Sequence, residues 1–314
     1  MAKYRHHLPQ LNGDLFLTDG GIETTLIFHA GLDLPFFAAF HLLKDEQGAA
    51  ALRQYFASHA AIARQYGVGF ILESATWRAR SDWGNKLGYS RQALDEANRK
   101  AIAFLHELRL ELETDRVPMV ISGCVGPRGD GYDPGVIMSP EEAEAYHAAQ
   151  IGTFAATEAD LVTAITMTNT NEAIGVTRAA RTSGMPVVIS FTVETAGKLP
   201  TGQPLPEAIQ EVDAATGRAP AYYMINCAHP SHFEAVLDGQ AWMERLRGIR
   251  ANASKRGHAE LDAAPDLDDG DPVELGKQYS DLRTRFSQIN VLGGCCGTDH
   301  RHIEHIGAAC TTAA

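Results

Sequence analysis

Three of the five cysteines in this chain of 314 residues stand directly after short apolar runs. Cys227 follows the run 222–226, and the adjacent pair Cys295 and Cys296 follows the run 291–294. Runs of this length and composition are typical of buried strands. If both are parallel strands of one barrel, their carboxyl ends meet at the same face, and the three thiols can converge there.

Three converging thiolates are a ligand set that suits Zn²⁺ and leaves a fourth coordination position open. Glycines at 293, 294 and 297 would let the backbone turn so that adjacent cysteines face one metal. A free thiol has a pKa of about 8.5 and is only a few per cent ionised at pH 7. A metal that binds an incoming thiol deprotonates it. The expected chemistry is attack of that thiolate on an electrophilic carbon.

The same cysteines admit two other interpretations. Most free cysteines are small buried hydrophobic residues, and the adjacent pair 295–296 could instead be a redox pair. The paired C-x₂-C knuckles of structural zinc sites and the H-x-E…P-C-x-x-C pattern of zinc deaminases are both absent. Spacing alone therefore leaves zinc binding, packing and redox chemistry open.

The elements that would position these thiols alternate regularly along the chain. Eight strand-like runs, each followed by a helical pattern, predict the α/β class and a (β/α)₈ TIM barrel, with residues 1–314 forming a single domain. The strands are expected at 15–18, 68–72, 117–122, 161–166, 187–191, 222–226, 249–252 and 289–292. The helices are expected at 49–66, 91–112, 139–158, 171–183, 206–216, 232–237, 273–286 and 300–309.

Two long segments interrupt this alternation, and both would lie at the catalytic face of the barrel. One joins the first strand to its helix over 19–49, and it contains Phe36, Phe37 and Phe40, for which packing is expected rather than an anchor or oligomer contact. The other, 255–271, is polar and acidic. It is interpreted as a mobile solvated loop rather than a metal site, since it lacks an EF-hand pattern. Its aspartates are Asp262, Asp266, Asp268, Asp269 and Asp271.

Composition excludes several function classes. The net charge of −12, from 27 basic and 39 acidic residues, disfavours nucleic-acid binding and docking on an anionic membrane. No run of about 18 apolar residues is present to span a bilayer, and residues 1–10 do not resemble a secretory signal. Five cysteines form no disulfide framework, so we expect a cytoplasmic protein with reduced thiols.

Four motifs in order along the chain give the sequence a family resemblance. They are 18–24 (TDGGIET), 123–127 (GCVGP), 225–227 (INC) and 293–298 (GGCCGT). With them the sequence resembles the homocysteine S-methyltransferase family over nearly its whole length. The resemblance implies a (β/α)₈ barrel and one Zn²⁺ per chain, held by Cys227, Cys295 and Cys296, with the homocysteine sulfur as the exchangeable ligand.

The resemblance also implies roles for residues around the metal. Asp19, with the backbone of Gly20 and Gly21, is the implied contact for the amino-acid end of homocysteine, although an aspartate before two glycines also suits a plain turn. Asn226 would lie beside the metal and help to orient the catalytic site. Cys124 replaces a serine of the family loop, and neither it nor Cys310 is assigned a role.

Two departures from the family pattern affect the substrates. Ile165 stands where the family usually has a glutamate that helps to hold the homocysteine amine, and Glu73 or Glu194, both near strand ends, could supply the lost charge. The other departure is after the second strand, where Trp77 could face a methyl-onium donor by a cation–π contact. Trp83 is a weaker candidate for the same role, and plain packing is the alternative for both.

These observations lead to a functional hypothesis with stated rivals. The chain is expected to be a methyltransferase that moves a methyl group from a small onium donor, such as S-methylmethionine or betaine, to homocysteine, giving methionine. Methylation of another small thiol, or demethylation of the donor for catabolism, is the first alternative. A zinc- and thiol-binding protein without turnover and a barrel with a 295–296 redox disulfide are the others. The expected partners are small molecules, and a homo-oligomer is possible.

Overall fold

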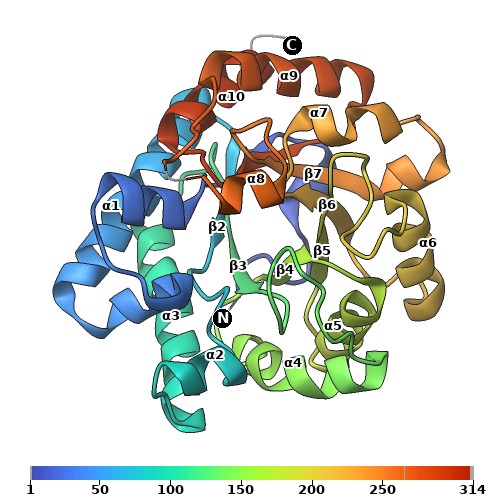
Figure 1. Ribbon diagram of the computed structural model, residues 1–314. Helices are drawn as coiled ribbons and strands as arrows, with labels where there is room; N and C mark the ends of the chain where they lie inside the picture. Colours follow the sequence, from blue (N-terminus) through green and yellow to red (C-terminus); the bar gives the residue numbers. More distant parts are fainter. Residues whose placement is uncertain (1, 265, 312–314) are drawn as a thin grey trace.

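A closed barrel of eight parallel strands forms the centre of the computed structural model, which describes residues 2–264 and 266–311 (Figure 1). Each strand pairs with its neighbours in chain order, and β8 pairs with β1 to close the ring. This confirms the (β/α)₈ prediction. The strands are β1 (Phe16–Leu17), β2 (Gly69–Glu73), β3 (Met119–Val125), β4 (Leu161–Met167), β5 (Val187–Thr192), β6 (Tyr222–Asn226), β7 (Leu246–Ala251) and β8 (Val291–Gly294).

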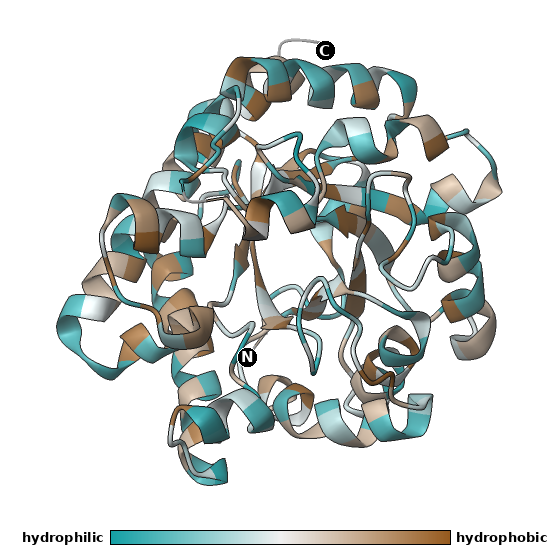
Figure 2. Ribbon diagram, viewed as in Figure 1, coloured by the Kyte–Doolittle hydropathy of each residue, from teal (hydrophilic) through white to brown (hydrophobic). Residues whose placement is uncertain are grey.

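Helices surround the barrel and cover its outer surface (Figure 1). They are α1 (Glu46–Tyr66), α2 (Ser81–Lys86), α3 (Arg91–Leu112), α4 (Pro140–Ala155), α5 (Thr170–Thr182), α6 (Leu205–Thr216), α7 (Pro230–Phe233), α8 (His258–Asp262), α9 (Pro272–Arg285) and α10 (His300–Thr311). Along the helices hydrophobic and hydrophilic residues are interspersed, as expected when one side packs on the strands and the other meets water (Figure 2).

The interior of the barrel is a packed core rather than a pore. Phe16, Val120, Tyr222 and Val291 belong to a buried cluster contributed by several strands. A Cβ on Gly69 would collide with the ring of Phe16, so glycine makes room for that ring. A larger cluster fills the space between strands and helices. The filled interior leaves the carboxyl ends of the strands as the face on which a site can form.

Local chemistry explains where the helices begin. Asp45 accepts a hydrogen bond from the backbone N–H of Gly48 at 2.8 Å, so α1 begins at Glu46, three residues before the predicted start at 49. Ser139 and Glu142 form a capping box at the start of α4, as the sequence predicted. The short helices α2 and α8 were not predicted. Within the described residues no helix has the length and apolar character needed to cross a membrane.

The two long segments at the catalytic face depart from expectation. In 19–49, Phe40 is buried as predicted, but packing is wrong for Phe36 and Phe37, which are about half exposed. The segment 255–271 is not simply a solvated loop, because it contains α8 and its Leu261 and Leu267 help to line a cavity. In the described part of this segment, no carboxylates gather with the spacing of metal ligands.

Candidate active site

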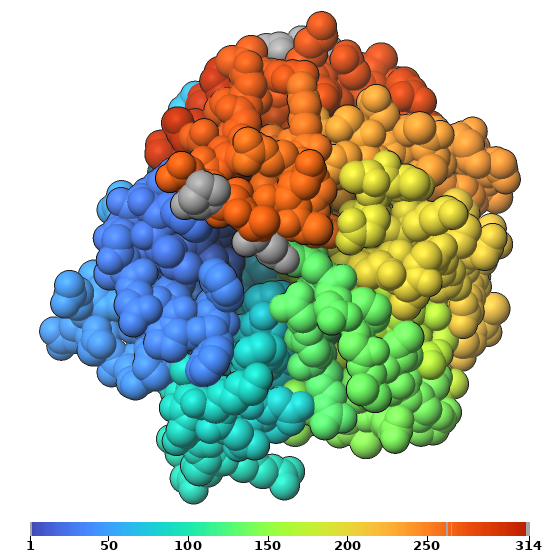
Figure 3. Space-filling view, viewed as in Figure 1, coloured from blue at the N-terminus to red at the C-terminus, as the bar shows by residue number. Residues whose placement is uncertain are grey.

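A cavity of about 490 Å³ opens at the carboxyl ends of the strands. It is lined by residues from β2, β3, β4 and β7 and from the segments that follow β1, β2, β3, β6, β7 and β8. On the face seen in Figure 3, a hollow lies where the blue, green and orange parts of the chain meet. A cavity of this volume is suited to a small molecule.

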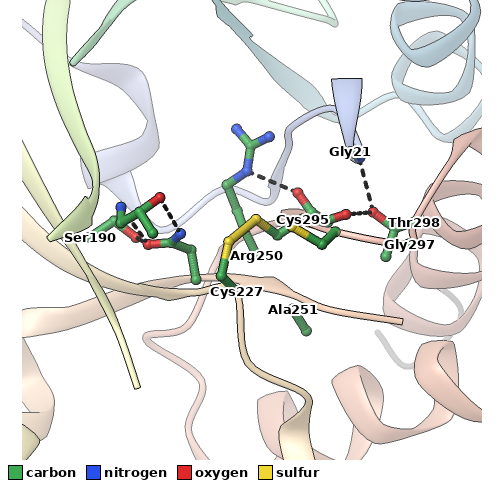
Figure 4. Close-up of a disulfide and its surroundings, with 12 residues drawn as sticks. Gly21, Ser190, Cys227, Arg250, Ala251, Cys295, Gly297 and Thr298 are labelled. Carbon is green, nitrogen blue, oxygen red and sulfur yellow. Dashed lines mark hydrogen bonds between the residues drawn. A yellow bond between two sulfur atoms is a disulfide. The ribbon is translucent and has the colours of Figure 1, made fainter. Parts of the chain in front are cut away.

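The three cysteines singled out in the sequence meet in this cavity. The sulfur atoms of Cys227, Cys295 and Cys296 all lie within 4.8 Å of one another. Cys227 and Cys295 are joined in a disulfide with a Cα–Cα distance of 5.3 Å (Figure 4). Cys296 is exposed and is not part of that disulfide. The expectation that all five cysteines are reduced is therefore wrong for two of them. The redox alternative is also corrected, because the bonded pair is 227–295 rather than the adjacent 295–296.

The sulfur positions fit a zinc ion once that disulfide is reduced. Two sulfurs bound to one zinc at about 2.3 Å are about 3.8 Å apart in a tetrahedron, and never more than about 4.6 Å. A set of sulfurs all within 4.8 Å needs only a small adjustment to reach this geometry. Two cysteines close enough to form a disulfide are also close enough to share a metal. All three cysteines line the cavity, so a zinc ion bound to their sulfurs would keep its fourth coordination position open toward the cavity.

Backbone geometry holds the sulfurs in place. Cys227 has a φ of 53°, in the left-handed region that non-glycine residues rarely adopt. Its N–H donates to the carbonyl of Arg250 at 3.1 Å, and the N–H of Cys295 donates to Ala251 at 2.8 Å, so β7 anchors both cysteines. A Cβ at Gly21 would lie 2.6 Å from the carbonyl oxygen of Cys295, so only glycine lets the two segments approach this closely.

Asn226 is fully buried directly before Cys227 and does not line the cavity. Its Oδ1 accepts hydrogen bonds from the N–H of Thr166 at 3.0 Å and from the hydroxyl of Ser190 at 2.6 Å. Thr166 also has a positive φ, 65°. The amide of Asn226 thus ties β4, β5 and β6 together beside the metal-binding sulfurs, which favours a positioning role.

Aromatic and titratable side chains gather around Cys296. The Tyr132 hydroxyl lies 3.0 Å from the sulfur of Cys296, and the Tyr132 ring stacks on His258 with 3.9 Å between centroids. Nδ1 of His258 lies 2.8 Å from a carboxylate oxygen of Glu194, and its Nε2 contacts the carbonyl of Cys227. Segments that follow β3, β5 and β7 therefore close over the sulfurs.

A buried charge cluster lies beside the sulfurs. Nη2 of Arg250 donates to Oδ1 of Asp19 at 2.6 Å, and its Nη1 is 3.6 Å from Oε2 of Glu73. The hydroxyl of Tyr55 donates to the other oxygen of Asp19 at 2.9 Å. Burial raises the pKa of Glu73 to about 7, against the opposing effect of Arg250. Burial lowers the pKa of Arg250, but Asp19 and Glu73 outweigh it and hold that pKa above its usual value.

Three buried donors on residues that line the cavity have no hydrogen-bond partner among the described residues. They are Nη1 of Arg250, Nε of Arg78 and the indole N–H of Trp77, and all three residues line the cavity. Buried unpaired donors are rare and call for an explanation, such as a ligand. Sequence reasoning missed both arginines. An arginine inside the strand-like run 249–252 was the available signal for Arg250.

The substrate residues predicted from the sequence fall into two groups. Asp19, Gly20, Gly21, Glu73 and Trp77 line the cavity, as does Ile165 in the position of the missing acid. Glu194 does not line it, and its carboxylate pairs with His258 instead.

The predicted donor side is already occupied by cations of the protein. The guanidinium of Arg78 lies 4.0 Å from the ring of Trp77 and 3.7 Å from that of Trp83, and Lys86 lies 4.0 Å from the ring of Trp83. The onium contact at either tryptophan stays a prediction.

The two remaining cysteines differ in position. Cys124 lies on β3 and lines the cavity, and its burial raises the pKa of its thiol well above the usual value. Cys310 is buried in the large core cluster between strands and helices. The structure therefore places Cys124 within reach of a ligand and Cys310 away from it.

Comparison with known proteins gives a family match and a structural match. A model of the homocysteine S-methyltransferase family matches residues 16–310. The oxidized form of the homocysteine methyltransferase MmuM from Escherichia coli is 19% identical with a TM-score of 0.72, covering 94% of this chain and 96% of that one. Its metallated form is 18% identical with a TM-score of 0.71, covering 97% and 98%. No curated protein sequence matches this chain as a relative.

Proposed function

Because this chain belongs to the homocysteine S-methyltransferase family, we propose that it is a zinc-dependent enzyme that methylates the thiol of homocysteine with a small onium compound as donor. The observation that carries this proposal is the convergence of three cysteine sulfurs, all within 4.8 Å, at the wall of a cavity large enough for both substrates. The similar E. coli structure is described as a homocysteine methyltransferase with a metallated form, which supports the same reading.

The cysteines would hold the metal, and the surrounding residues would hold the acceptor. Cys227, Cys295 and Cys296 would hold the zinc ion, which would supply a Lewis acid that lowers the pKa of an incoming thiol. Asn226 fixes the strand end that carries Cys227, through its hydrogen bonds to Thr166 and Ser190. No side chain has to act as a general base, since the proton leaves to solvent as the thiol binds.

The transfer itself is a displacement at carbon. The acceptor sulfur forms a bond to the methyl carbon while the bond from that carbon to the positively charged sulfur or nitrogen of the donor breaks. The breaking electron pair stays on the donor atom, which becomes neutral. The protein's task is to align the two substrates and to exclude water. The segments that carry Tyr132 and His258 cover the sulfurs and suit this task.

The test is a transfer assay on reduced, zinc-loaded protein. The protein is reduced with a phosphine, because a thiol reductant would compete as acceptor, and is then incubated with homocysteine and with S-methylmethionine or betaine. With S-methylmethionine we expect mass spectrometry to find two methionines for each homocysteine consumed, because the demethylated donor is also methionine, and with betaine we expect methionine and dimethylglycine in equal amounts. A metal assay should find about one zinc per chain. Zinc binding without any methylated thiol would contradict the proposal and favour a binding protein without turnover.

A further inference from the structure

Arg250 lines the cavity and has a buried donor that nothing in the described part of the chain satisfies. Its side chain is more than nine-tenths buried, and its Nη1 has no hydrogen-bond acceptor among residues 2–264 and 266–311. We propose that Arg250 binds the carboxylate of the acceptor thiol through Nη1, and that this carboxylate, rather than the ammonium group, is what the site chiefly recognises. The inference rests on the proposed function, because it concerns the acceptor of that reaction.

The strand register places Arg250 beside the reacting sulfur. Arg250 is the pairing partner of Asn226 on β6 and of Gly293 on β8. Cys227 follows the first of these directly, and Cys295 lies two residues after the second. The guanidinium accordingly projects next to the joined sulfurs of Cys227 and Cys295 (Figure 4). A short thiol held at the sulfurs would have its other end near this cation.

The guanidinium is held in one orientation before any ligand arrives. Its Nε donates to the carbonyl of Gly294 at 3.1 Å, and its Nη2 donates to Asp19 at 2.6 Å and to the carbonyl of Gly20 at 3.3 Å. Only Nη1 remains, with the nearest carboxylate oxygen, on Glu73, at 3.6 Å. A carboxylate entering the cavity would complete the set, and a preorganised guanidinium loses little conformational entropy on binding it.

The partners that the family resemblance gives to the ammonium group are weakened in this chain. Asp19 already contacts Arg250 through one oxygen and Tyr55 through the other. Ile165 replaces the other expected acid. Of the remaining acids, burial raises the pKa of Glu23 and of Glu73 to about 7, so each is partly neutral at that pH. The site thus offers a carboxylate a guanidinium N–H group that has no hydrogen-bond acceptor in the described residues, and it offers an ammonium group no strong, free anion.

Three acceptors that share the same three-carbon chain next to the thiol test this inference. Homocysteine carries both groups, 4-mercaptobutanoate lacks the ammonium group, and 3-mercaptopropylamine lacks the carboxylate. We expect kcat/KM for 4-mercaptobutanoate to stay within about 10-fold of that for homocysteine. For 3-mercaptopropylamine it should fall about 10- to 100-fold, as a lost charge-assisted hydrogen bond implies.

Two variants test whether Arg250 causes the preference for the carboxylate acceptor over the amine acceptor. Arg250→Lys keeps a cation opposite Asp19 and Glu73 but removes the fixed guanidinium, so the preference for carboxylate over amine should shrink to about 3-fold. Arg78→Lys changes the other arginine of the cavity and serves as the matched control, with the preference retained. Thermal unfolding and zinc content of each variant show that the fold and metal site are intact. A preference that survives Arg250→Lys, or collapses only in Arg78→Lys, would overturn the inference.

A binding measurement separates this inference from the proposed function. The methylated products 4-(methylthio)butanoate and 3-(methylthio)propylamine need no deprotonation, so calorimetry on the wild-type protein reports their recognition without turnover. Tighter binding of the carboxylate compound supports the role of Arg250 even if no thiol is methylated. Equal binding of the two compounds would refute that role even if homocysteine is methylated.

Discussion

Two arginine–carboxylate pairs are buried at opposite ends of the barrel, and they differ in what surrounds them. At the amino-terminal end, Nη1 of Arg109 donates to Asp160 at 2.6 Å, and the carboxylate of Asp160 also accepts from the backbone N–H groups of Tyr4 and Ile121. At the carboxyl-terminal end, Arg250 pairs with Asp19 at the same distance, but its Nη1 has no acceptor in the described residues.

The difference shows how one kind of interaction can have two uses. A buried pair whose every hydrogen bond is satisfied inside the protein can only maintain the fold. A buried pair with a donor left over, at the wall of a cavity, is incomplete without a ligand. Polar groups at the bottom of such barrels generally provide stability, whereas those at the carboxyl ends of the strands provide catalysis. We call the carboxyl-terminal end of the barrel its mouth and the amino-terminal end its floor. Changes at the mouth should therefore affect activity, and changes at the floor should affect stability.

The largest effect is expected for Cys295→Ala, at the mouth. The variant should lose its zinc and about 10³-fold in kcat/KM, because an unbound thiol is only a few per cent ionised at pH 7 and is no longer held in place. Its unfolding in urea under reducing conditions should stay close to that of the wild type. Cys310→Ala is the control, since Cys310 lies in the core away from the cavity, and it should keep zinc and activity. Full zinc content in Cys295→Ala would contradict the ligand assignment.

The floor pair should give the opposite result. Arg109→Met leaves the carboxylate of Asp160 buried without its cation, which typically costs about 3–5 kcal/mol of unfolding free energy. Activity per folded molecule should remain within about 2-fold. Arg53→Met removes an exposed pair with Glu111, and we expect it to cost less than about 1 kcal/mol. If Arg109→Met lowered kcat/KM as strongly as Cys295→Ala does, the division between floor and mouth would fail.

Glu73, at the mouth, should make the unfolding free energy depend on pH. Its pKa in the folded protein is about 7, above its ordinary value of 4.5, so between these values the folded state keeps a proton that the unfolded state has lost. Stability from this residue is therefore complete below about pH 4.5 and is lost as the pH rises through 7, by about 3 kcal/mol.

Glu73→Gln should abolish this pH dependence. The difference in unfolding free energy between wild type and variant, measured by urea denaturation from pH 5 to pH 8, should shift in favour of the variant as the pH rises. A difference that stays constant over this range would show that Glu73 ionises normally in the folded protein.

The smallest effect is expected at the edge of the mouth. Glu194 pairs with His258 and does not line the cavity, so Glu194→Gln should change the acceptor KM by less than about 3-fold. Initial rates at varied homocysteine give this value directly, with Glu73→Gln as the comparison inside the cavity. A rise above about 10-fold would place Glu194 in the acceptor site, where it would replace the acid lost at Ile165.

The strands and helices could be predicted wherever the signal was local. Apolar runs and helix caps lie within a few residues of one another, so the eight strand and helix pairs were correct in order. The sequence predicts a strand at 249–252, but β7 begins at Leu246. Arg247 and Arg250 interrupt the apolar run, so the sequence pattern does not show where this strand starts. The sequence predicts a solvated loop where α8 forms, because the segment is polar and acidic and five residues are too few to show a helical pattern.

The candidate site could be predicted only in part. Cys227, Cys295 and Cys296 could be predicted because they follow strands and the carboxyl ends of barrel strands share one face, whereas the role of Asp19 came from the family resemblance. The disulfide between Cys227 and Cys295 was not found, since the adjacent pair was the obvious redox candidate. The ion pair between Arg250 and Asp19 could not be predicted either, because the two residues lie far apart in the sequence.

The sequence by itself determined the barrel and the three sulfurs at its mouth. The periodicity of hydrophobic residues, the turn residues and the motifs are all properties of residues that are close together in the chain. Only the tertiary structure decided which charges meet there. Arg250 and Asp19 are 231 residues apart, and Tyr132 and Cys296 are 164 apart. Closure of the barrel between β1 and β8 brings such residues into contact, and the contacts determine which polar atoms are satisfied and which remain for a ligand.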